Sequence, residues 1–452
     1  MTVVDLDDII KAYDVRGTYP DQLNGELARQ VGAAFVRVVG AAGGAIVVGR
    51  DMRPSGPELI EAFADGATSQ GADVILIGLA STDGLYFASG QLSLPGAMFT
   101  ASHNPAKYNG IKMCRPGAAP VGQDTGLREI KQMIRDSIPA YAGPRGRIRE
   151  QDMTGAYASF LRGLVDIAGV RRLKVVVDAG NGMGGYTVPV VLQGLPLEIV
   201  PMYFELDGTF PNHEANPIDP ENLRDLQAAV IAHGADIGLA FDGDADRCFV
   251  VDERGRIVDP STLTSLIAVR ELAKHPGAHV IHNLITSAAV PQIITEHGGI
   301  PVRTRVGHSF IKQRMAETGA VFGGEHSGHF YFSDFWNADS GMLAALHTLS
   351  ALGNTPSGTA LSSMLAPYER YVMSGEINSR VDDAAAKVAA VRSAFAARTT
   401  TDELDGVTFD GDGWWFNLRS SNTEPLLRLN VEAPTAEQVA AIVDEVLAIV
   451  RN

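Results

Sequence analysis

Short apolar runs separated by amphipathic stretches make up most of the chain. The apolar runs predict buried strands at residues 45–49, 73–77, 174–178, 197–202, 279–281 and 301–305. Helical patterns lie between the members of each pair, at residues 56–71, after residue 185 and at 287–297. Strand–helix–strand units with buried strands are typical of mostly parallel sheets covered by helices. We therefore predict three α/β domains, which repeat an architecture rather than a sequence.

The last part of the chain follows a different pattern. Apolar residues at 427, 429 and 431 alternate with polar ones, which predicts a half-buried strand. A helix that begins at Thr435 then places its apolar residues on one face. We predict a smaller α+β domain here, and domain limits at 1–145, 146–252, 253–366 and 367–452.

Composition and charge narrow the class of protein. The 452 residues are 45% apolar and 20% charged, which is typical of a folded chain of several domains. The formal net charge is −16 and no Lys/Arg run occurs, so neither nucleic acid nor an anionic membrane is an expected partner. The two cysteines lie in apolar runs and indicate buried thiols rather than disulfides or zinc ligands. Without a basic leader or a membrane-length apolar run, we expect a cytoplasmic protein.

The polar run at residues 100–105 is the first candidate for chemistry. It places Ser102 beside His103, directly after a predicted strand and before Asn104-Pro105, which disfavour a helix. Ser102 in this position is a nucleophile, a phosphate carrier or an ordinary turn residue.

Three carboxylates form the second candidate. Asp242, Asp244 and Asp246 alternate in a turn between apolar runs at 237–241 and 248–251. Such close like charges repel and raise each other's pKa, and a hard divalent cation removes that penalty. Oxygen ligands indicate Mg²⁺ or Ca²⁺ rather than zinc, and open coordination positions favour Mg²⁺. The alternative is a solvated acidic turn.

Two further loops carry weaker signals. Residues 323–329 supply Glu325, Ser327 and His329 among glycines, a set suited to sugar hydroxyls or to a hairpin turn that faces water. Residues 419–425 combine the Arg419 guanidinium with hydroxyl, amide and backbone donors, which make a phosphate cradle or an ordinary turn.

One arrangement unites these loops. Cationic residues recur beside glycines, at Arg16, Lys112, His308 and Lys312. If Ser102 carries a phosphoryl group, Mg²⁺ on the three aspartates would neutralise it and polarise the phosphorus for attack. Arg247 could bind an equatorial oxygen.

The four loops, in this order, resemble those of the α-D-phosphohexomutase family. Residues 100–105 are similar to its phosphoserine loop, 242–247 to its metal loop, 324–329 to its sugar-binding loop and 419–425 to its phosphate-binding loop. The resemblance implies three related α/β domains with mixed sheets plus a smaller C-terminal α+β domain around a central cleft. Each domain would supply one loop.

The resemblance also implies an activity. Phosphorylated Ser102 would donate its phosphoryl group to a hexose phosphate, and the hexose 1,6-bisphosphate would turn over in the cleft and return its other phosphate to Ser102. Phosphate thereby moves between C1 and C6. A hexose 1,6-bisphosphate would also activate the unphosphorylated enzyme. The substrates are hexose phosphates, and we expect a monomer or a small homo-oligomer.

Roles for individual residues follow from the same resemblance. Asp242, Asp244 and Asp246 would hold Mg²⁺ together with a phosphate oxygen on Ser102. Lys112 and His329 are candidates for general acid and base, with Arg16 near the phosphoserine and His103 shaping its loop. The substrate-binding set is Glu325, Ser327, His308 and Lys312 for the sugar, and Arg419, Ser421, Asn422 and Thr423 for the distal phosphate.

Two departures from the family pattern bear on the prediction. Ala245 stands where many relatives have glycine, and a small residue should preserve the turn. Asn422 in the Ser-Asn-Thr-Glu-Pro run and His326 resemble the phosphomannomutase/phosphoglucomutase branch rather than the phosphoglucosamine mutases. The pattern therefore favours mannose phosphates, with phosphoglucomutase or dual specificity as the alternative and phosphoglucosamine mutase after it.

Other classes of function fit less well. A serine hydrolase would leave the acidic turn unexplained, and the chain has no Gly-x-Ser-x-Gly motif. A phosphatase with an aspartate nucleophile needs a motif that Asp14 lacks. An inactive sugar-phosphate-binding protein predicts the loss of Ser102 or of a metal-loop aspartate, and all four are present.

Overall fold

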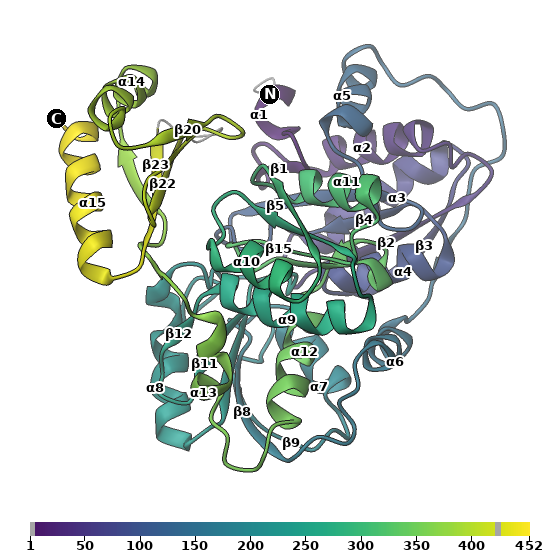
Figure 1. The fold of residues 1–452 in the computed structure, drawn as a ribbon. Coiled ribbons are helices and arrows are strands. Elements are labelled where there is room, and N and C mark those ends of the chain that lie inside the picture. The colour runs from purple at the N-terminus through teal and green to yellow at the C-terminus, as the bar shows by residue number, and fades with distance from the viewer. Residues whose placement is uncertain (1–4, 421–425) are drawn as a thin grey trace. The chain divides into compact units, whose positions relative to one another are not determined.

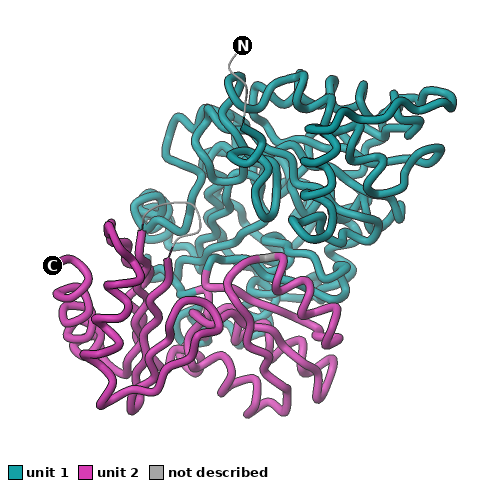
Figure 2. Tube along the Cα trace, turned by 90° about the horizontal axis from the view of Figure 1, so that it is seen from above, with its two compact units in different colours: residues 1–259, 327–364 teal, residues 260–326, 365–452 magenta. Residues whose placement is uncertain are grey.

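The computed structural model describes residues 5–420 and 426–452. The chain forms two compact units, one from residues 1–259 with 327–364 and the other from 260–326 with 365–452 (Figure 2). The predicted fold class, three α/β domains with mixed sheets and a smaller C-terminal α+β domain, is confirmed. The four domain limits stay predictions. Within the described part of the chain, no helix is long and apolar enough to cross a membrane.

The first sheet has seven strands in the order β1-β5-β4-β2-β3-β7, with β6 paired to β5. Figure 1 labels its strands β1 to β5. Its strands are β1 (Val15–Thr18), β2 (Ala45–Arg50), β3 (Asp73–Leu79), β4 (Gly96–Phe99), β5 (Tyr108–Arg115), β6 (Ala119–Pro120) and β7 (Ile148–Glu150). Its helices are α1 (Leu6–Ile9), α2 (Gly25–Val38), α3 (Gly56–Ser69), α4 (Thr82–Leu92) and α5 (Leu127–Arg135). The apolar run at 46–48 lies in β2, wholly buried between parallel neighbours β3 and β4, as such runs predict.

The second sheet has the order β12-β11-β10-β8-β9. Its strands are β8 (Leu173–Asp178), β9 (Leu197–Met202), β10 (Ile237–Phe241), β11 (Cys248–Asp252) and β12 (Ile257–Val258), and its neighbouring helices are α6 (Thr154–Leu164), α7 (Gly184–Val191) and α8 (Arg224–His233). Strands β8, β9 and β10 are parallel, whereas β10 and β11 form an antiparallel hairpin. The acidic turn is therefore the connection between two buried antiparallel strands. Both cysteines are buried, as predicted.

Residues 260–364 belong to both units. The second unit holds the parallel strands β13 (His279–Asn283), β14 (Ile300–Thr304) and β15 (Phe322–Gly324), with helices α9 (Pro260–Lys274), α10 (Ala289–Glu296) and α11 (His308–Thr318). The first unit holds the antiparallel pair β16 (Phe330–Phe332) and β17 (Ala338–Asp339), followed by α12 (Gly341–Gly353) and all but the last residue of α13 (Leu361–Leu365). Helix α12 is almost wholly buried and packs against α6 and β11 of its own unit.

The C-terminal sheet is antiparallel throughout, in the order β18-β23-β22-β21-β20, with β19 also paired to β23. Its elements are β18 (Val372–Met373), β19 (Ile377–Arg380), β20 (Thr400–Asp402), β21 (Val407–Asp410), β22 (Trp415–Ser420), β23 (Leu426–Ala433), α14 (Ala384–Phe395) and α15 (Ala436–Val450). The prediction of a half-buried β23 is wrong in part, because Asn430 and Glu432 are only 2% and 1% exposed. The Glu432 carboxylate accepts hydrogen bonds from Trp415 Nε1 at 2.7 Å and from the backbone N–H of Ala288 at 2.9 Å, which replace water.

Buried Asp83 connects three helices of the first unit. Its carboxylate accepts hydrogen bonds from the hydroxyls of Tyr157 on α6 at 2.8 Å and of Ser340 at 2.6 Å, and also from that of Ser81. Ser81 and Ser340 are also the N-caps of α4 and α12. Burial raises the pKa of Asp83 to about 6, against an ordinary value of 3.8, although the three hydroxyls oppose the shift. The folded protein thus binds a proton here more tightly than the unfolded chain does.

This shift predicts that Asp83 destabilises the fold as pH rises. Between about pH 4 and pH 6 the unfolded chain gives up this proton while the folded protein retains it, so stability is lost across that window. Above pH 6 the raised pKa lowers the free energy of unfolding by about 3 kcal/mol. We expect the melting temperature of Asp83→Asn, relative to wild type, to rise from about pH 4 to pH 7 in calorimetry. Asp152→Asn is the control, because hydrogen bonds from Thr154 hold the pKa of Asp152 below its ordinary value and hence below this window. A pH-independent difference for Asp83→Asn would contradict the prediction.

Candidate active site

Ser102 lies in the loop that follows β4. The residue adopts the left-handed backbone conformation, with φ of 49°, and is 3% exposed. Its Oγ donates a hydrogen bond to Asp242 Oδ2 at 2.7 Å, although the two residues are 140 positions apart in the chain. The same Oγ lies 3.1 Å from Arg247 Nη2. The predicted serine and the predicted acidic turn therefore meet at one point.

The three aspartates of the β10–β11 turn are all buried. One carboxylate oxygen from each lies within 4.8 Å of the others. Burial and repulsion from its neighbours raise the pKa of Asp242 to about 7, even though Arg247 opposes the shift. Among the described residues, Asp244 Oδ1 and Asp246 Oδ1 are buried and accept no hydrogen bond. Carboxylate oxygens with unused lone pairs fit a hard divalent cation such as Mg²⁺.

The turn itself explains why a small residue is needed at position 245. Ala245 has φ of 58° and is buried. Glycine adopts this left-handed conformation without strain, whereas alanine tolerates it at a cost of about 1–2 kcal/mol. The three carboxylates converge in spite of the methyl group.

Two cationic side chains lie among these carboxylates. Lys112 on β5 places Nζ 2.7 Å from Asp244 Oδ2 and 2.6 Å from Asp246 Oδ2. Burial disfavours the charged ammonium, but the two aspartates outweigh it and hold the pKa of Lys112 well above its ordinary value. Arg247 Nε donates to Asp242 Oδ2 at 3.0 Å. Both groups stay charged and can face an anionic phosphoryl group.

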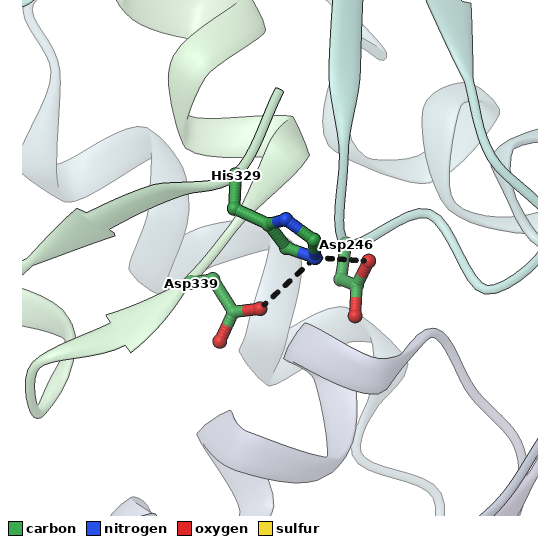
Figure 3. Close-up of side chains that lie close together, drawn as sticks. All are labelled: Asp246, His329 and Asp339. Atoms are coloured by element: carbon green, nitrogen blue, oxygen red, sulfur yellow. Dashed lines mark ion pairs between the residues drawn. The ribbon is translucent and has the colours of Figure 1, made fainter. Parts of the chain in front are cut away.

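His329 lies between two acidic side chains (Figure 3). Its Nε2 is 3.5 Å from Asp246 Oδ1 and 4.0 Å from Asp339 Oδ2, while its Nδ1 is 3.0 Å from Ser327 Oγ. Carboxylates on this side stabilise the protonated imidazole once it has accepted a proton. Asp339, the last residue of β17, was not predicted from the sequence.

Arg16 and His103 flank the serine loop. Arg16 on β1 donates to Asn104 Oδ1 at 2.5 Å and pairs with Asp14 at 2.5 Å. His103 Nδ1 is 3.2 Å from Ser102 Oγ and also contacts Arg247 Nη2. Burial, followed by the charges of Arg247 and Arg16, holds the pKa of His103 well below its ordinary value. The neutral ring can accept a hydrogen bond from Arg247 Nη2 at its Nδ1.

The predicted sugar-binding residues are divided between the units. Glu325 follows β15 in the second unit, and its Oε1 accepts from the backbone N–H of Gly307 at 3.1 Å. Gly307 is the N-cap of α11, the helix that carries His308 and buried Lys312. Ser327 and His329 belong to the first unit.

Asn283 at the end of β13 was missed by the sequence analysis. The side chain is wholly buried, and its Nδ2 lies 3.0 Å from His326 Nδ1 and 3.5 Å from Glu325 Oε1. Its position two residues after the predicted strand at 279–281 was the available signal.

The predicted phosphate-binding loop begins at Arg419 on β22. Arg419 pairs with Glu376 at 3.2 Å, and Arg428, its cross-strand neighbour on β23, pairs with the same carboxylate at 3.3 Å. Two guanidiniums thus stand side by side where the two strands enter the loop. Ser421, Asn422 and Thr423 lie outside the described residues.

Comparisons with known proteins agree on one family. The sequence matches the phosphoglucomutase/phosphomannomutase family in all four of its parts: α/β/α domain I at residues 7–139, domain II at 156–255, domain III at 259–371 and the C-terminal domain at 376–449. It is 43% identical to a protein of Xanthomonas campestris named phosphohexose mutases, over 93% of this chain and 94% of that one. It is 40% identical to a phosphomannomutase of Salmonella typhimurium, over 94% of each chain. A phosphoglucomutase/phosphomannomutase family protein of Burkholderia thailandensis has a similar solved structure, with a TM-score of 0.89, 33% identity and coverage of 99% of this chain and 98% of that chain.

Proposed function

Because the chain belongs to the phosphoglucomutase/phosphomannomutase family, and so is a phosphohexomutase, we propose that it interconverts mannose 1-phosphate and mannose 6-phosphate. The transfer passes through phosphorylated Ser102 and a hexose 1,6-bisphosphate. The observation that carries this proposal is the position of Ser102 Oγ, 2.7 Å from Asp242 in a buried cluster of three carboxylates and two cations.

The serine acts as the carrier of the phosphoryl group. A hydroxyl of the substrate attacks phosphorus, so that a new P–O bond to the sugar forms as the P–O bond to Ser102 breaks. In the second half of the cycle Ser102 Oγ attacks the other phosphate of the bisphosphate and is phosphorylated again. Asp242, Asp244 and Asp246 would hold Mg²⁺, which would neutralise negative charge at the transferring phosphoryl group.

Proton transfer is assigned to Lys112 and His329. His329 Nε2 faces the Asp246 and Asp339 carboxylates, which favour the imidazolium formed when the ring takes the proton of the attacking hydroxyl. Lys112 is protonated when the transfer begins, so it can stabilise the transferring phosphoryl group and then donate its proton to the departing oxygen.

The surrounding residues bind the substrate and orient the serine loop. Arg247, with Nη2 3.1 Å from Ser102 Oγ, binds an equatorial oxygen of the phosphoryl group, and Arg16 holds the loop through Asn104. Neutral His103 shapes the loop. The sugar hydroxyls are held by Glu325, Ser327, His308 and Lys312, and the distal phosphate by Arg419, Ser421, Asn422 and Thr423.

The preference for mannose rests on the relatives and on the phosphate loop. Relatives of about 40% identity are named phosphomannomutase or phosphohexose mutases. Residues 421–425 read Ser-Asn-Thr-Glu-Pro, the run that resembles the phosphomannomutase/phosphoglucomutase branch.

A direct comparison of substrates tests this proposal. We expect kcat/KM to be highest for mannose 1-phosphate, with glucose 1-phosphate within about tenfold, because the two differ at one hydroxyl and one hydrogen bond contributes about 0.5–1.5 kcal/mol. Glucosamine 1-phosphate should be the poorest of the three. All are assayed side by side with Mg²⁺ and a hexose 1,6-bisphosphate activator. A highest kcat/KM for glucosamine 1-phosphate would contradict the preference, and absence of turnover on all three would contradict the function.

A further inference from the structure

Arg53 is the largest side chain that is completely enclosed in the described part of the chain, at 0% exposure. It lies just after β2, and its Nε donates to Asp51 Oδ2 at 3.2 Å. Asp51 is also wholly buried, and its Oδ1 accepts from the backbone N–H of Arg53 at 2.9 Å. Burying a guanidinium and a carboxylate together costs free energy because both lose their water. The guanidinium N–H groups that do not bind Asp51 therefore need other hydrogen-bond acceptors.

The four remaining contacts of Arg53 go to the serine loop and to Tyr108, the first residue of β5 after it. Nη2 donates to the carbonyl oxygens of Ser102 at 2.8 Å and Asn104 at 2.6 Å, and Nη1 donates to those of Pro105 at 3.0 Å and Tyr108 at 2.9 Å. The carbonyl groups of the serine loop therefore converge on a single planar cation. Only arginine offers five donors in a fixed fork, whereas lysine offers three.

Arg53 is enclosed on its other side by the segment around Phe210. The guanidinium carbon lies 5.1 Å from the centre of the Phe210 ring, and a Cβ at Gly208 would come within 2.8 Å of Arg53 Cα. A side chain held on every side in this way is a rigid support. Its contacts are to carbonyl oxygens rather than to the Ser102 hydroxyl, and Asp51 offsets its charge, so it is not placed to bind the phosphoryl group.

The loop that Arg53 holds has a strained backbone at the reacting residue. Ser102 has φ of 49°, and its N–H donates to Thr100 Oγ1 at 2.9 Å. The Thr100 hydroxyl in turn is hydrogen-bonded to Asp51. With the Ser102 carbonyl fixed on Arg53, the side chain is directed toward Asp242. A strained left-handed backbone at a non-glycine residue persists only where contacts with the surrounding structure hold it in place.

We propose that Arg53, supported by Asp51, is a positioning residue for phosphoryl transfer. It binds the inward-facing carbonyls of residues 102–108 and thereby keeps Ser102 Oγ beside the acidic turn. This inference rests on the proposed function. A misplacement of the reacting atoms by about 1 Å can lower a rate by about 10²-fold without a matching loss of ground-state binding.

The test compares Arg53→Lys with Arg37→Lys. Lysine at position 53 keeps the charge but leaves at least two of the five acceptors without a donor. Arg37 is the matched control, because it also binds backbone carbonyls, those of Pro139 and Ala140, and it does not contact the serine loop. Both substitutions should lower the melting temperature, so kcat and KM are measured well below the lower of the two.

We expect Arg53→Lys to lower kcat by about 10²-fold while KM for the hexose phosphate stays within about threefold. Arg37→Lys should retain wild-type kcat. A kcat for Arg53→Lys within twofold of wild type would overturn the proposal, as would an equal fall in Arg37→Lys or an effect confined to KM. Wild-type protein without any turnover would instead contradict the proposed function.

A second variant covers the case in which Arg53→Lys does not fold. Asp51→Asn keeps the guanidinium and an acceptor of similar shape but removes the charge that orients Arg53. We expect kcat to fall by about three- to tenfold, less than in Arg53→Lys, again with KM nearly unchanged. An Asp51→Asn protein with wild-type kcat would then reject the positioning role.

Discussion

Ser102→Ala is expected to lower turnover of hexose phosphates by at least about 10³-fold, because it removes the atom that we propose carries the phosphoryl group between the two half-reactions. The variant should fold normally, since the lost hydroxyl only donates a hydrogen bond to Asp242, accepts one from Arg247 and lies beside His103. Steady-state assays with a hexose 1,6-bisphosphate activator measure the loss. Peptide mapping by mass spectrometry should find a phosphoryl group on Ser102 of wild-type protein and none at this position in the variant.

Ser93→Ala is the matched control for this experiment. Ser93 also has a left-handed backbone, with φ of 54°, but it is exposed at the end of α4. The Ser93→Ala variant should retain wild-type activity. The comparison then shows whether activity depends on the Ser102 hydroxyl or only on a serine with a left-handed backbone. Full activity in Ser102→Ala would refute the carrier role outright.

Removal of divalent metal is expected to lower turnover by at least about 10³-fold, and Mg²⁺ should restore it. The reason is that a bound cation contributes several kcal/mol of charge stabilisation at a transferring phosphoryl group. The candidate ligands are three buried carboxylates, and two of them have an oxygen that accepts no hydrogen bond from the described residues. Titration calorimetry gives a second readout that does not depend on catalysis.

Asp244→Asn should weaken Mg²⁺ binding in that titration, whereas Asp412→Asn, at an exposed carboxylate, should not. Undiminished activity after thorough chelation would contradict the metal assignment. Equal binding by the Asp244 variant and wild type would place the metal elsewhere.

The sequence predicted those parts of the molecule that local pattern determines. The run at 46–48 is apolar because both faces of β2 are covered, and the acidic turn is conspicuous because its carboxylates alternate between two apolar strands. The meeting of Ser102 and Asp242 could be inferred from chemistry alone, since a phosphoryl group and three carboxylates call for a shared cation. Their roles in catalysis stay proposals.

Contacts between distant segments could not be predicted in the same way. Nothing in the local sequence distinguishes Arg53 from a surface arginine. The carbonyl oxygens that it binds lie about fifty residues further along the chain. Asp83 takes three hydroxyls from three separate helices, and Glu432 is buried because a tryptophan and a backbone N–H lie against it. Polar residues of this kind depend on tertiary partners, which no local periodicity records.

The discontinuous first unit has a consequence for the order in which the molecule is completed during synthesis. Residues 1–259 leave the ribosome before residues 327–364, which supply His329 and the buried helix α12. Chains emerge from the amino end, and domains commonly fold as they emerge. The first unit therefore cannot complete its fold until residues 260–326 and then its second segment have been synthesised. Until then the surfaces of α6 and β11 that α12 covers are exposed to chaperones and proteases, so a nascent chain arrested near residue 300 should be far more susceptible to cleavage than the finished protein.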